Sequence, residues 1–450
     1  MTTLSSDTLS PTKRQPELNN VKLDFPVVGI GASAGGIQAT LSFFEHMPSD
    51  SGMAFVVIMH LSPDHKSGVD KVLQGVTSMP VQQVTGPLAI EPNHIYVISP
   101  ALELSMDGGM LRVSDAEPQS GGHVAIDIFF RTLAEVHTDR AFGVLLSGTG
   151  SDGSMGLSRI KEQGGVTIAQ MPDDAEHDGM PRSAIATGNV DLVLPVAAIP
   201  GKLVQLWENA RRIRLPHAHP DSDTVARVVV EGEEREQAEQ ALGDLLDLLF
   251  AETGHNFRHY KRATVLRRVE RRLQVNTQSD LPAYLAYVKG HPEENQALLA
   301  DLLIGVTNFF RDREPFEALE RNVIPMLFST SESGLNDPGE IRVWSAGCSS
   351  GEEAYSLAML LCDQARMISS PMRIQVFATD IDERAIAKGR QGIFAESIAA
   401  DVSPARLHDT APAGPDNAGC RRYAPPALPA SAIQRPWPRP RPVRHSPDGG

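Results

Sequence analysis

The chain has 450 residues, of which 41% are hydrophobic and 22% charged, with a formal net charge of −15. This length suits roughly two or three domains, and the acidic balance argues against a nucleic-acid-binding protein, which normally presents a basic surface. No apolar run approaches the roughly 20 residues of a membrane-spanning helix, so we expect no direct insertion into a membrane. The cysteines Cys348, Cys362 and Cys420 have no paired spacing, which predicts a reducing, cytoplasmic location and neither disulfides nor a metal site.

The first part of the chain predicts an α/β domain. Residues 1–24 are polar and lack the apolar core of a secretory signal, so we expect a disordered leader. Residues 25–205 alternate β-branched runs with helical patterns such as GIQATLSFFEHM and GSMGLSRIKEQG, which predicts a doubly wound, mostly parallel sheet. The expected strands are FPVVGIG, GMAFVVIMH, HIYVISP, FGVLLSG, GVTIAQ and DLVLP. LELSMDGGMLRVS predicts a hairpin that turns on DGG.

The rest of the chain predicts three further regions after a linker. Residues 206–235 are polar and contain prolines, as a linker would. Residues 236–330 have apolar residues at helical spacing and predict a small all-helical domain. Residues 331–396 contain IRVWSAG, EEAYSLAMLLCDQA and MRIQVFATD, a strand–helix–strand pattern that predicts the start of a Rossmann-like domain. Residues 397–450 are rich in Pro and Arg and show no periodicity, which predicts a disordered tail.

GIGASAGG, residues 29–36, joins the first expected strand to the first helix. One interpretation is a loop that binds a dinucleotide. Gly29, Gly31 and Ala34 satisfy the fingerprint GxGxxG/A, which would indicate a nucleotide-dependent oxidoreductase. That fingerprint normally has an acidic residue at the end of the second strand. Here the second strand ends at His60, which counts against a nicotinamide cofactor.

The second interpretation makes the hydroxyl of Ser33 a nucleophile. His60 follows the second strand and Asp152 follows FGVLLSG, and the carboxyl ends of parallel strands meet at one edge of a sheet. The three side chains could therefore form a catalytic triad, with N–H groups of the following helix available to stabilise an oxyanion. Each residue alone also has a structural explanation: a serine in a Gly-rich turn, a histidine that ends a strand, and an aspartate that caps a helix.

Four separated segments resemble the catalytic domain of chemotaxis protein-glutamate methylesterases of the CheB type: GIGASAGG, MHLSPDHKS, LLSGTGSDGSMGLSRIKEQGG and TIAQMPDDAEHDGMPRSAIATG. The resemblance covers about residues 25–200. It implies that Ser33, His60 and Asp152 are nucleophile, base and orienting acid, and that this half needs no cofactor. The implied reaction is hydrolysis of glutamyl methyl esters on chemoreceptors, with deamidation of glutamine as a further activity. The family's N-terminal phosphoacceptor domain does not precede the first strand, so we expect no phosphorylation control by that route.

Residues 240–396 resemble chemotaxis receptor methyltransferases of the CheR type, through FRHYKRATVLRRVERRL, LLIGVTNFFRDREPFEAL, IRVWSAGCSSGEEAYSLAMLL and VFATDID. The resemblance implies S-adenosylmethionine as cofactor, contacted by Thr307, Arg311, Glu353 and Asp380. Asp380 ends a strand, where a carboxylate can accept ribose hydroxyls. Glu353 alone could equally be a carboxylate that the dipole of the following helix favours.

The helix that contains Arg267, Arg268, Arg271 and Arg272 concentrates positive charge on one side. A solvated face is the simplest explanation of such a run, whereas the resemblance implies that it faces acidic methylation helices of a chemoreceptor. Because the family pattern stops near residue 396, we expect a weak or absent cofactor site and a truncated or out-of-frame tail. The resulting hypothesis is a chemotaxis adaptation enzyme with a complete methylesterase half and a truncated methyltransferase half. The alternative is a non-catalytic receptor-docking scaffold, which would have no use for a triad.

Overall fold

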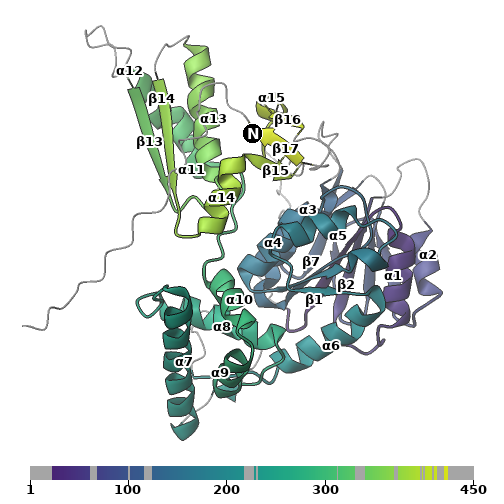
Figure 1. Ribbon diagram of the computed structural model, residues 1–450. Coiled ribbons are helices and arrows are strands. Elements are labelled where there is room, and N and C mark those ends of the chain that lie inside the picture. Colours follow the sequence, from purple (N-terminus) through teal and green to yellow (C-terminus); the bar gives the residue numbers. More distant parts are fainter. Residues whose placement is uncertain are drawn as a thin grey trace, which may run out of the picture.

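The protein is described by a computed structural model (Figure 1). The described residues are 23–60, 68–99, 102–115, 124–216, 228–229, 232–311, 313–329, 340–368, 373–395, 398, 401–407, 410–412 and 420–423. Nearly all of the expected leader therefore lies outside them. Within these ranges, no helix is both long and apolar enough to cross a membrane.

A seven-stranded parallel sheet in the order β10-β9-β8-β1-β2-β5-β3 forms the centre of the first domain. Its strands are β1 Val27–Ala32, β2 Ala54–Met59, β3 Val81–Val84, β5 Ile95–Ile98, β8 Ala141–Leu145, β9 Val166–Gln170 and β10 Leu192–Leu194. Every residue of β1, β2 and β8 is buried, as expected for strands with helices on both faces. The predicted parallel sheet is confirmed, and β3 is a strand that the sequence patterns did not indicate.

Helices cover both faces of this sheet, so the doubly wound architecture is confirmed (Figure 1). The helices are α1 Gly36–Glu45, α2 Val69–Gln74, α3 Ala125–His137, α4 Ser154–Gln163, α5 Gly179–Ala186 and α6 Ile199–Ala210. Phe43 and Phe44 of α1 belong to the apolar cluster on one face, and Phe129 and Phe130 of α3 to the cluster on the other. Three short 3₁₀ helices, Thr138–Arg140, Pro172–Asp174 and Val196–Ala198, complete the connections.

The predicted hairpin is also present. Strands β6 Leu102–Asp107 and β7 Met110–Asp115 pair antiparallel, and β4 Leu88–Ala89 adds a third strand to them. The turn contains Gly108 at a φ of 59°, a left-handed conformation that glycine adopts without steric cost.

The helical domain consists of α7 Gly232–Thr253, α8 Arg262–Val275, α9 Leu281–Gly290 and α10 Glu293–Leu302, which share one apolar cluster. The expected linker is shorter than the sequence suggested. Helix α6 continues to Ala210 because Leu206 packs into the core of the first domain, and β11 Arg214–Leu215 pairs with β12 Val228–Val229. The proline-containing segment 217–227 lies outside the described residues.

The third region contains the predicted strand–helix–strand unit: β13 Glu340–Ala346, α13 Glu352–Met367 and the parallel strand β14 Arg373–Thr379, followed by α14 Glu383–Gln391. Helices α11 Arg313–Ala318 and α12 Ile324–Ser329, joined by the π-helical turn Leu319–Val323, were expected in the helical domain. Ile324 and Phe328 instead pack against Ile341 and Ala358 of the strand–helix unit. Phe316 of α11 is partly buried against the same cluster, so both helices belong with the third region.

The expectation of a structureless tail from residue 397 is wrong for part of that stretch. Helix α15 Pro404–Leu407 follows residue 398, and β15 Ile393–Ala395, β17 Cys420–Tyr423 and β16 Thr410–Pro412 form a small antiparallel sheet. Ile398, Val402 and Leu407 are buried with Phe309 and Phe394. These apolar side chains give this stretch a core that its Pro and Arg content did not suggest. Residues 424–450 lie outside the described residues.

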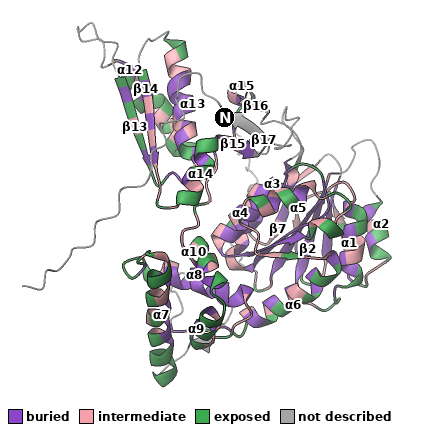
Figure 2. Cartoon of the chain, viewed as in Figure 1, coloured by how far each residue is buried: buried purple, intermediate pink, exposed green. Residues whose placement is uncertain are grey.

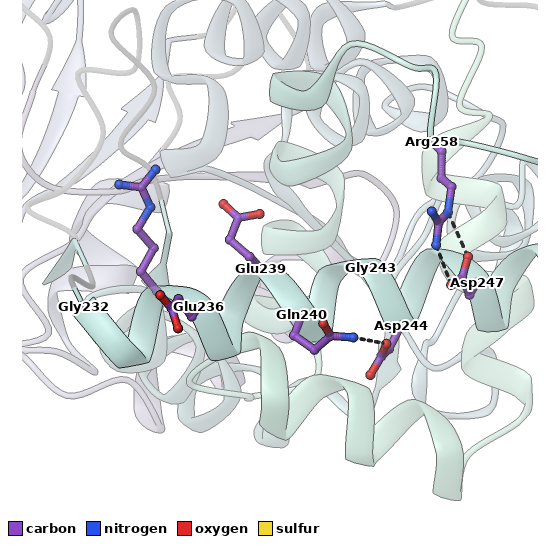
Figure 3. Close-up of a pocket in the computed structure, with 9 residues that line it drawn as sticks. Gly232, Glu236, Glu239, Gln240, Gly243, Asp244, Asp247 and Arg258 are labelled. Atoms are coloured by element: carbon purple, nitrogen blue, oxygen red, sulfur yellow. Dashed lines mark hydrogen bonds and ion pairs between the residues drawn. The ribbon is translucent and has the colours of Figure 1, made fainter.

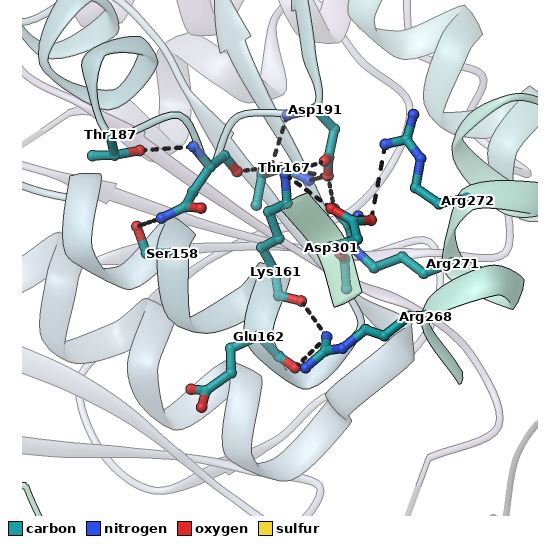
Figure 4. A network of polar contacts seen from close by, with 12 residues as sticks. Ser158, Lys161, Glu162, Thr167, Thr187, Asp191, Arg268, Arg271, Arg272 and Asp301 are labelled. Atoms are coloured by element: carbon teal, nitrogen blue, oxygen red, sulfur yellow. Dashed lines mark hydrogen bonds and ion pairs between the residues drawn. The ribbon is translucent and has the colours of Figure 1, made fainter. Parts of the chain in front are cut away.

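Of the four arginines expected to form the charged side of the basic helix, three are buried and only Arg267 is exposed, which corrects the expectation of a receptor-facing surface. Arg268, Arg271 and Arg272 of α8 are at most 7% exposed, and α8 is mainly buried whereas α7 is largely exposed (Figure 2). Arg268 donates to the carbonyl oxygen of Glu162 at 2.8 Å, and Arg271 binds Asp191. Figure 4 shows these contacts joining α8 to the first domain. Sequence spacing located the charged stripe but could not show that another domain covers it.

Candidate active site

Ser33 lies in the turn between β1 and α1, which its neighbours hold in a fixed shape. Its backbone N–H donates to the carbonyl oxygen of Ser147 at 3.0 Å, and its carbonyl oxygen accepts from Gly36 N–H at 2.8 Å. Gly35 has a φ of 71°, and a Cβ there would lie 2.7 Å from Ser147 Oγ. A glycine is therefore required directly before α1. Because Ser33 N–H is already bonded, it is not a free donor for an oxyanion.

His60 follows β2, which pairs with β1 so that Ala32 and Met59 are partners. This register places the imidazole beside Ser33. His60 Nδ1 lies 3.2 Å from Ser33 Oγ, and Nε2 lies 2.8 Å from Asp152 Oδ2. The His60 side chain is 17% exposed and the Asp152 side chain 4%. The three residues that the sequence predicted to meet at the sheet edge are thus in contact.

Asp152 is held by a helix that the sequence patterns did not single out. Its Oδ2 accepts from Ile126 N–H at 3.0 Å, and its Oδ1 accepts from Asp127 N–H at 2.9 Å. Both donors belong to the first turn of α3, where backbone N–H groups lack partners within the helix and the helix dipole favours negative charge. The helical spacing of apolar residues in AIDIFFRTLAEVH could have indicated this helix. It could not have indicated the contact of this helix with Asp152.

The contacts determine which nitrogen of His60 can act as a base. An ionised carboxylate only accepts hydrogen bonds, so Asp152 stabilises the tautomer that carries its proton on Nε2. Nδ1 then carries the lone pair that faces the Ser33 hydroxyl. The arrangement can deprotonate Ser33 during attack on a carbonyl and stabilise the imidazolium that forms.

The segment that leads into α5 forms one wall beside Ser33. Ser147 Oγ accepts from His177 N–H at 2.9 Å and donates to the carbonyl oxygen of Ala34 at 2.9 Å, joining this segment to the turn. A Cβ on Gly148 would lie 2.9 Å from Ser33 Cβ and would collide with Met180. Arg182 of α5 pairs with Asp178 at 2.5 Å on the surface.

The residues predicted to bind S-adenosylmethionine lie around the turn between β13 and α13. Asp380 accepts from Ser349 N–H at 2.7 Å and from Asp382 N–H at 2.8 Å. Glu353 accepts from Ser345 Oγ at 2.8 Å. Both carboxylates thus support the carboxyl ends of the two parallel strands, and Gly351 in the turn has a φ of 98°.

Thr307 and Arg311 belong to residues 303–311, which follow α10 and are not helical. This segment packs against the turn, since Ser349 Oγ donates to Gly305 O and Phe310 N–H donates to Ser356 Oγ at 3.0 Å. Arg311 itself points to the first domain. Its guanidinium lies 3.0 Å from the Glu162 carboxylate and 2.5 Å from the carbonyl oxygen of Val306.

A surface pocket lies along α7 in the helical domain, and Figure 3 shows its charged lining. Arg258 pairs with Asp247 at 2.5 Å, and Gln240 donates to Asp244 at 2.7 Å. No residue of the triad lines this pocket. Across the described ranges, no group of three or more His, Cys, Asp and Glu side chains is arranged to hold a metal ion.

Family models match three parts of the chain. The CheB methylesterase model matches residues 28–203, the all-alpha domain of CheR methyltransferase residues 240–303, and the SAM-binding domain of CheR methyltransferase residues 305–414.

Several known proteins are similar to this chain. An uncharacterized 104.1 kDa protein of Rhodobacter capsulatus is 39% identical over 333 residues; the match covers 72% of this chain, which spans about one third, 34%, of that protein. A protein-glutamate methylesterase/protein-glutamine glutaminase of Leptospira interrogans is 31% identical over 42% of this chain and 97% of its own length. The crystal structure of the Thermotoga maritima CheB methylesterase catalytic domain has a TM-score of 0.38 and 26% identity, and the match covers 40% of this chain and 98% of that one.

The order of the matches agrees with the order of the domains in the structure. The parallel sheet with its Ser–His–Asp contact corresponds to the first matched range. The helices α7 to α10 correspond to the second. The chain belongs to the CheB methylesterase family and continues into the all-alpha and SAM-binding domains of the CheR methyltransferase family.

Proposed function

We propose that the first domain hydrolyses glutamyl methyl esters on the cytoplasmic methylation helices of chemoreceptors, with Ser33 as nucleophile, His60 as base and Asp152 as orienting acid. The observation that carries this proposal is the position of His60, which contacts Ser33 Oγ and Asp152 Oδ2 at the same time. The names of relatives with the CheB domain, protein-glutamate methylesterase/protein-glutamine glutaminase, support the same substrate class.

The reaction follows from the geometry in two steps. Ser33 Oγ attacks the ester carbonyl carbon while His60 Nδ1 takes the hydroxyl proton, and the imidazolium then gives that proton to the methoxide oxygen, so that methanol leaves. Water next attacks the acyl-enzyme with His60 again as base, which frees the glutamate carboxylate and restores Ser33. Asp152 stabilises the imidazolium in both steps. A glutamine side chain would react in the same way and release ammonia.

For the CheR part, we propose that Thr307, Arg311, Glu353 and Asp380 hold S-adenosylmethionine. Asp380 at the end of β14, with Glu353 in the first turn of α13 and a glycine turn beside them, fits a ligand with ribose hydroxyls. Arg311 fits a carboxylate, since it already binds that of Glu162. When bound, S-adenosylmethionine would supply the methyl group for esterification of a glutamate. Our sequence-based expectation of weak or absent cofactor binding stays a prediction. It depended on a family pattern that ends near residue 396, whereas the SAM-binding domain model matches this chain through residue 414.

Methanol release from a methylated receptor fragment tests the esterase. We expect the full chain to release methanol and Ser33→Ala to release none, whereas Ser42→Ala in α1 should behave as the unmodified chain. Release that survives in Ser33→Ala would contradict the assigned nucleophile. No release from the unmodified chain, together with binding of the fragment, would instead favour the receptor-docking scaffold.

A further inference from the structure

Asp127 of α3 and Asp152 are linked by reciprocal contacts between the starts of α3 and α4. Asp152 precedes α4, and its carboxylate accepts from the first-turn N–H groups of α3. Asp127 lies in that first turn of α3, and its Oδ1 accepts from Gly156 N–H in the first turn of α4 at 2.6 Å. Asp152, which precedes α4, therefore accepts from the start of α3, and Asp127 of α3 accepts from the start of α4.

The two helix starts are also packed as closely as backbone allows. A Cβ on Gly156 would lie 3.2 Å from Asp127 Cα and 3.2 Å from its carbonyl oxygen, so the helices approach through a position without a side chain. Asp127 is 0% exposed. A buried carboxylate is costly unless hydrogen bonds compensate it, so its placement between α3 and α4 needs an explanation beyond the packing of apolar residues around it.

We propose that Asp127 is a positioning residue for the esterase, an inference that rests on the proposed function. Its bond to Gly156 N–H fixes the first turn of α3 relative to α4. The first turn of α3 then presents the N–H groups of Ile126 and Asp127 to the Asp152 carboxylate. The Asp152 carboxylate is thereby held with Oδ2 facing His60 Nε2, so that Asp127 acts on the reaction through Asp152.

The first test measures methanol release by the full chain with Asp127→Ala and Asp127→Asn. Without the acceptor for Gly156 N–H, Asp127→Ala should lower kcat roughly 10- to 100-fold, the range typical of small misplacements in an active site, with KM changed less than about twofold. Asparagine has the same shape and keeps an acceptor oxygen for Gly156 N–H, so Asp127→Asn should retain most of kcat. Labelling of Ser33 by a fluorophosphonate should slow in parallel and also count the folded active sites. Val136→Ala, in the last turn of α3, is the control for loss of helix packing and should leave kcat unchanged.

The second test separates positioning from general stability by repeating Asp127→Asn and Asp127→Ala in an Asp152→Asn background. If Asp127 acts only through Asp152, its effect on kcat should nearly vanish there, because residues that act as one unit are not additive. An equal effect in both backgrounds, or an unchanged kcat per labelled site in Asp127→Ala, would overturn the inference while the proposed function stands. Absence of both methanol release and Ser33 labelling in the unmodified chain would overturn the proposed function, and the inference with it.

Discussion

Arg271 of α8 and Asp191 of the first domain form an ion pair that is almost fully removed from solvent, with side-chain exposures of 1% and 0%. Arg271 also binds Asp301, and the Lys161 ammonium lies 3.3 Å from both carboxylates. The network joins the methylesterase domain to the helical domain (Figure 4). Buried charges are tolerated only when paired, so the two domains should dock in one geometry.

Replacement of Arg271 should destabilise the full chain more than any exposed arginine of the same helix. Arg271→Met leaves Asp191 and Asp301 without their main partner, and breaking a buried pair in this way costs about 3–5 kcal/mol. Urea unfolding of the full chain measures the loss. Arg267 is exposed on the same helix, and Arg267→Met should change stability by less than about 0.5 kcal/mol. Equal effects of the two substitutions would contradict a structural role for the network.

Acid should weaken the same interface. Burial raises the pKa of the Asp191 carboxyl, but the charges of Arg271 and Lys161 outweigh burial and hold this pKa well below its usual range. A lowered pKa gives stability that is present above the unfolded-state pKa, about 3.9, and is lost as pH falls toward the folded-state pKa. We expect the melting temperature to be steady above about pH 5 and to fall below about pH 4. Asp191→Asn should be less stable near neutral pH and show a shallower fall in acid.

Glu352 should have the opposite pH dependence. Burial raises the pKa of its carboxyl from 4.5 to about 7, although Ser350 Oγ donates to both of its oxygens. A raised pKa gives stability that is complete below the unfolded-state pKa and is lost as pH rises through the folded-state pKa. Glu352→Gln should therefore stabilise the third region at pH 8, by about 3 kcal/mol at most, and have little effect at pH 4. Hydrogen exchange of β13 and α13 measures this, with Glu383→Gln on α14 as control.

Glu162 should compete with the cofactor for Arg311. The Glu162 carboxylate pairs with the Arg311 guanidinium. We propose that the same guanidinium binds the carboxylate of S-adenosylmethionine. Glu162→Gln removes that charge, and calorimetric titration should show S-adenosylmethionine binding roughly tenfold tighter, equivalent to about 1.4 kcal/mol. Glu135→Gln, which removes an exposed partner of Arg159, is the matched control. Weaker or unchanged binding in Glu162→Gln would argue against the assigned role of Arg311.

Asp152 should matter for turnover more than for substrate binding. Asp152→Asn presents an amide to His60 and disfavours the tautomer with its proton on Nε2, so kcat should fall by roughly 10³-fold or more, as in other triads. KM should change little because Asp152 is buried behind His60. Steady-state methanol release measures both constants. A loss confined to KM would show that Asp152 shapes the binding surface instead.

The architecture of the first domain and the meeting of Ser33, His60 and Asp152 could be predicted from sequence patterns. Buried parallel strands have continuous apolar runs, and their carboxyl ends meet at one edge, so Ser33, His60 and Asp152 could be placed together before any coordinates. The recognisable segments also determined the order of the domains. These features depend on local patterns and on the general rule that parallel strands end at one edge of a sheet.

Which charges are available, and what supports the site, depended on how the finished elements pack. Arg268 and Arg271 of α8 are buried because the methylesterase domain covers them, and Arg311 points to Glu162, 149 residues away in the chain. The start of α3 meets Asp152 only because two helices cross at Gly156. Contacts between segments so far apart depend on how completed elements pack, and the periodicity of a single helix or strand contains no information about its partner.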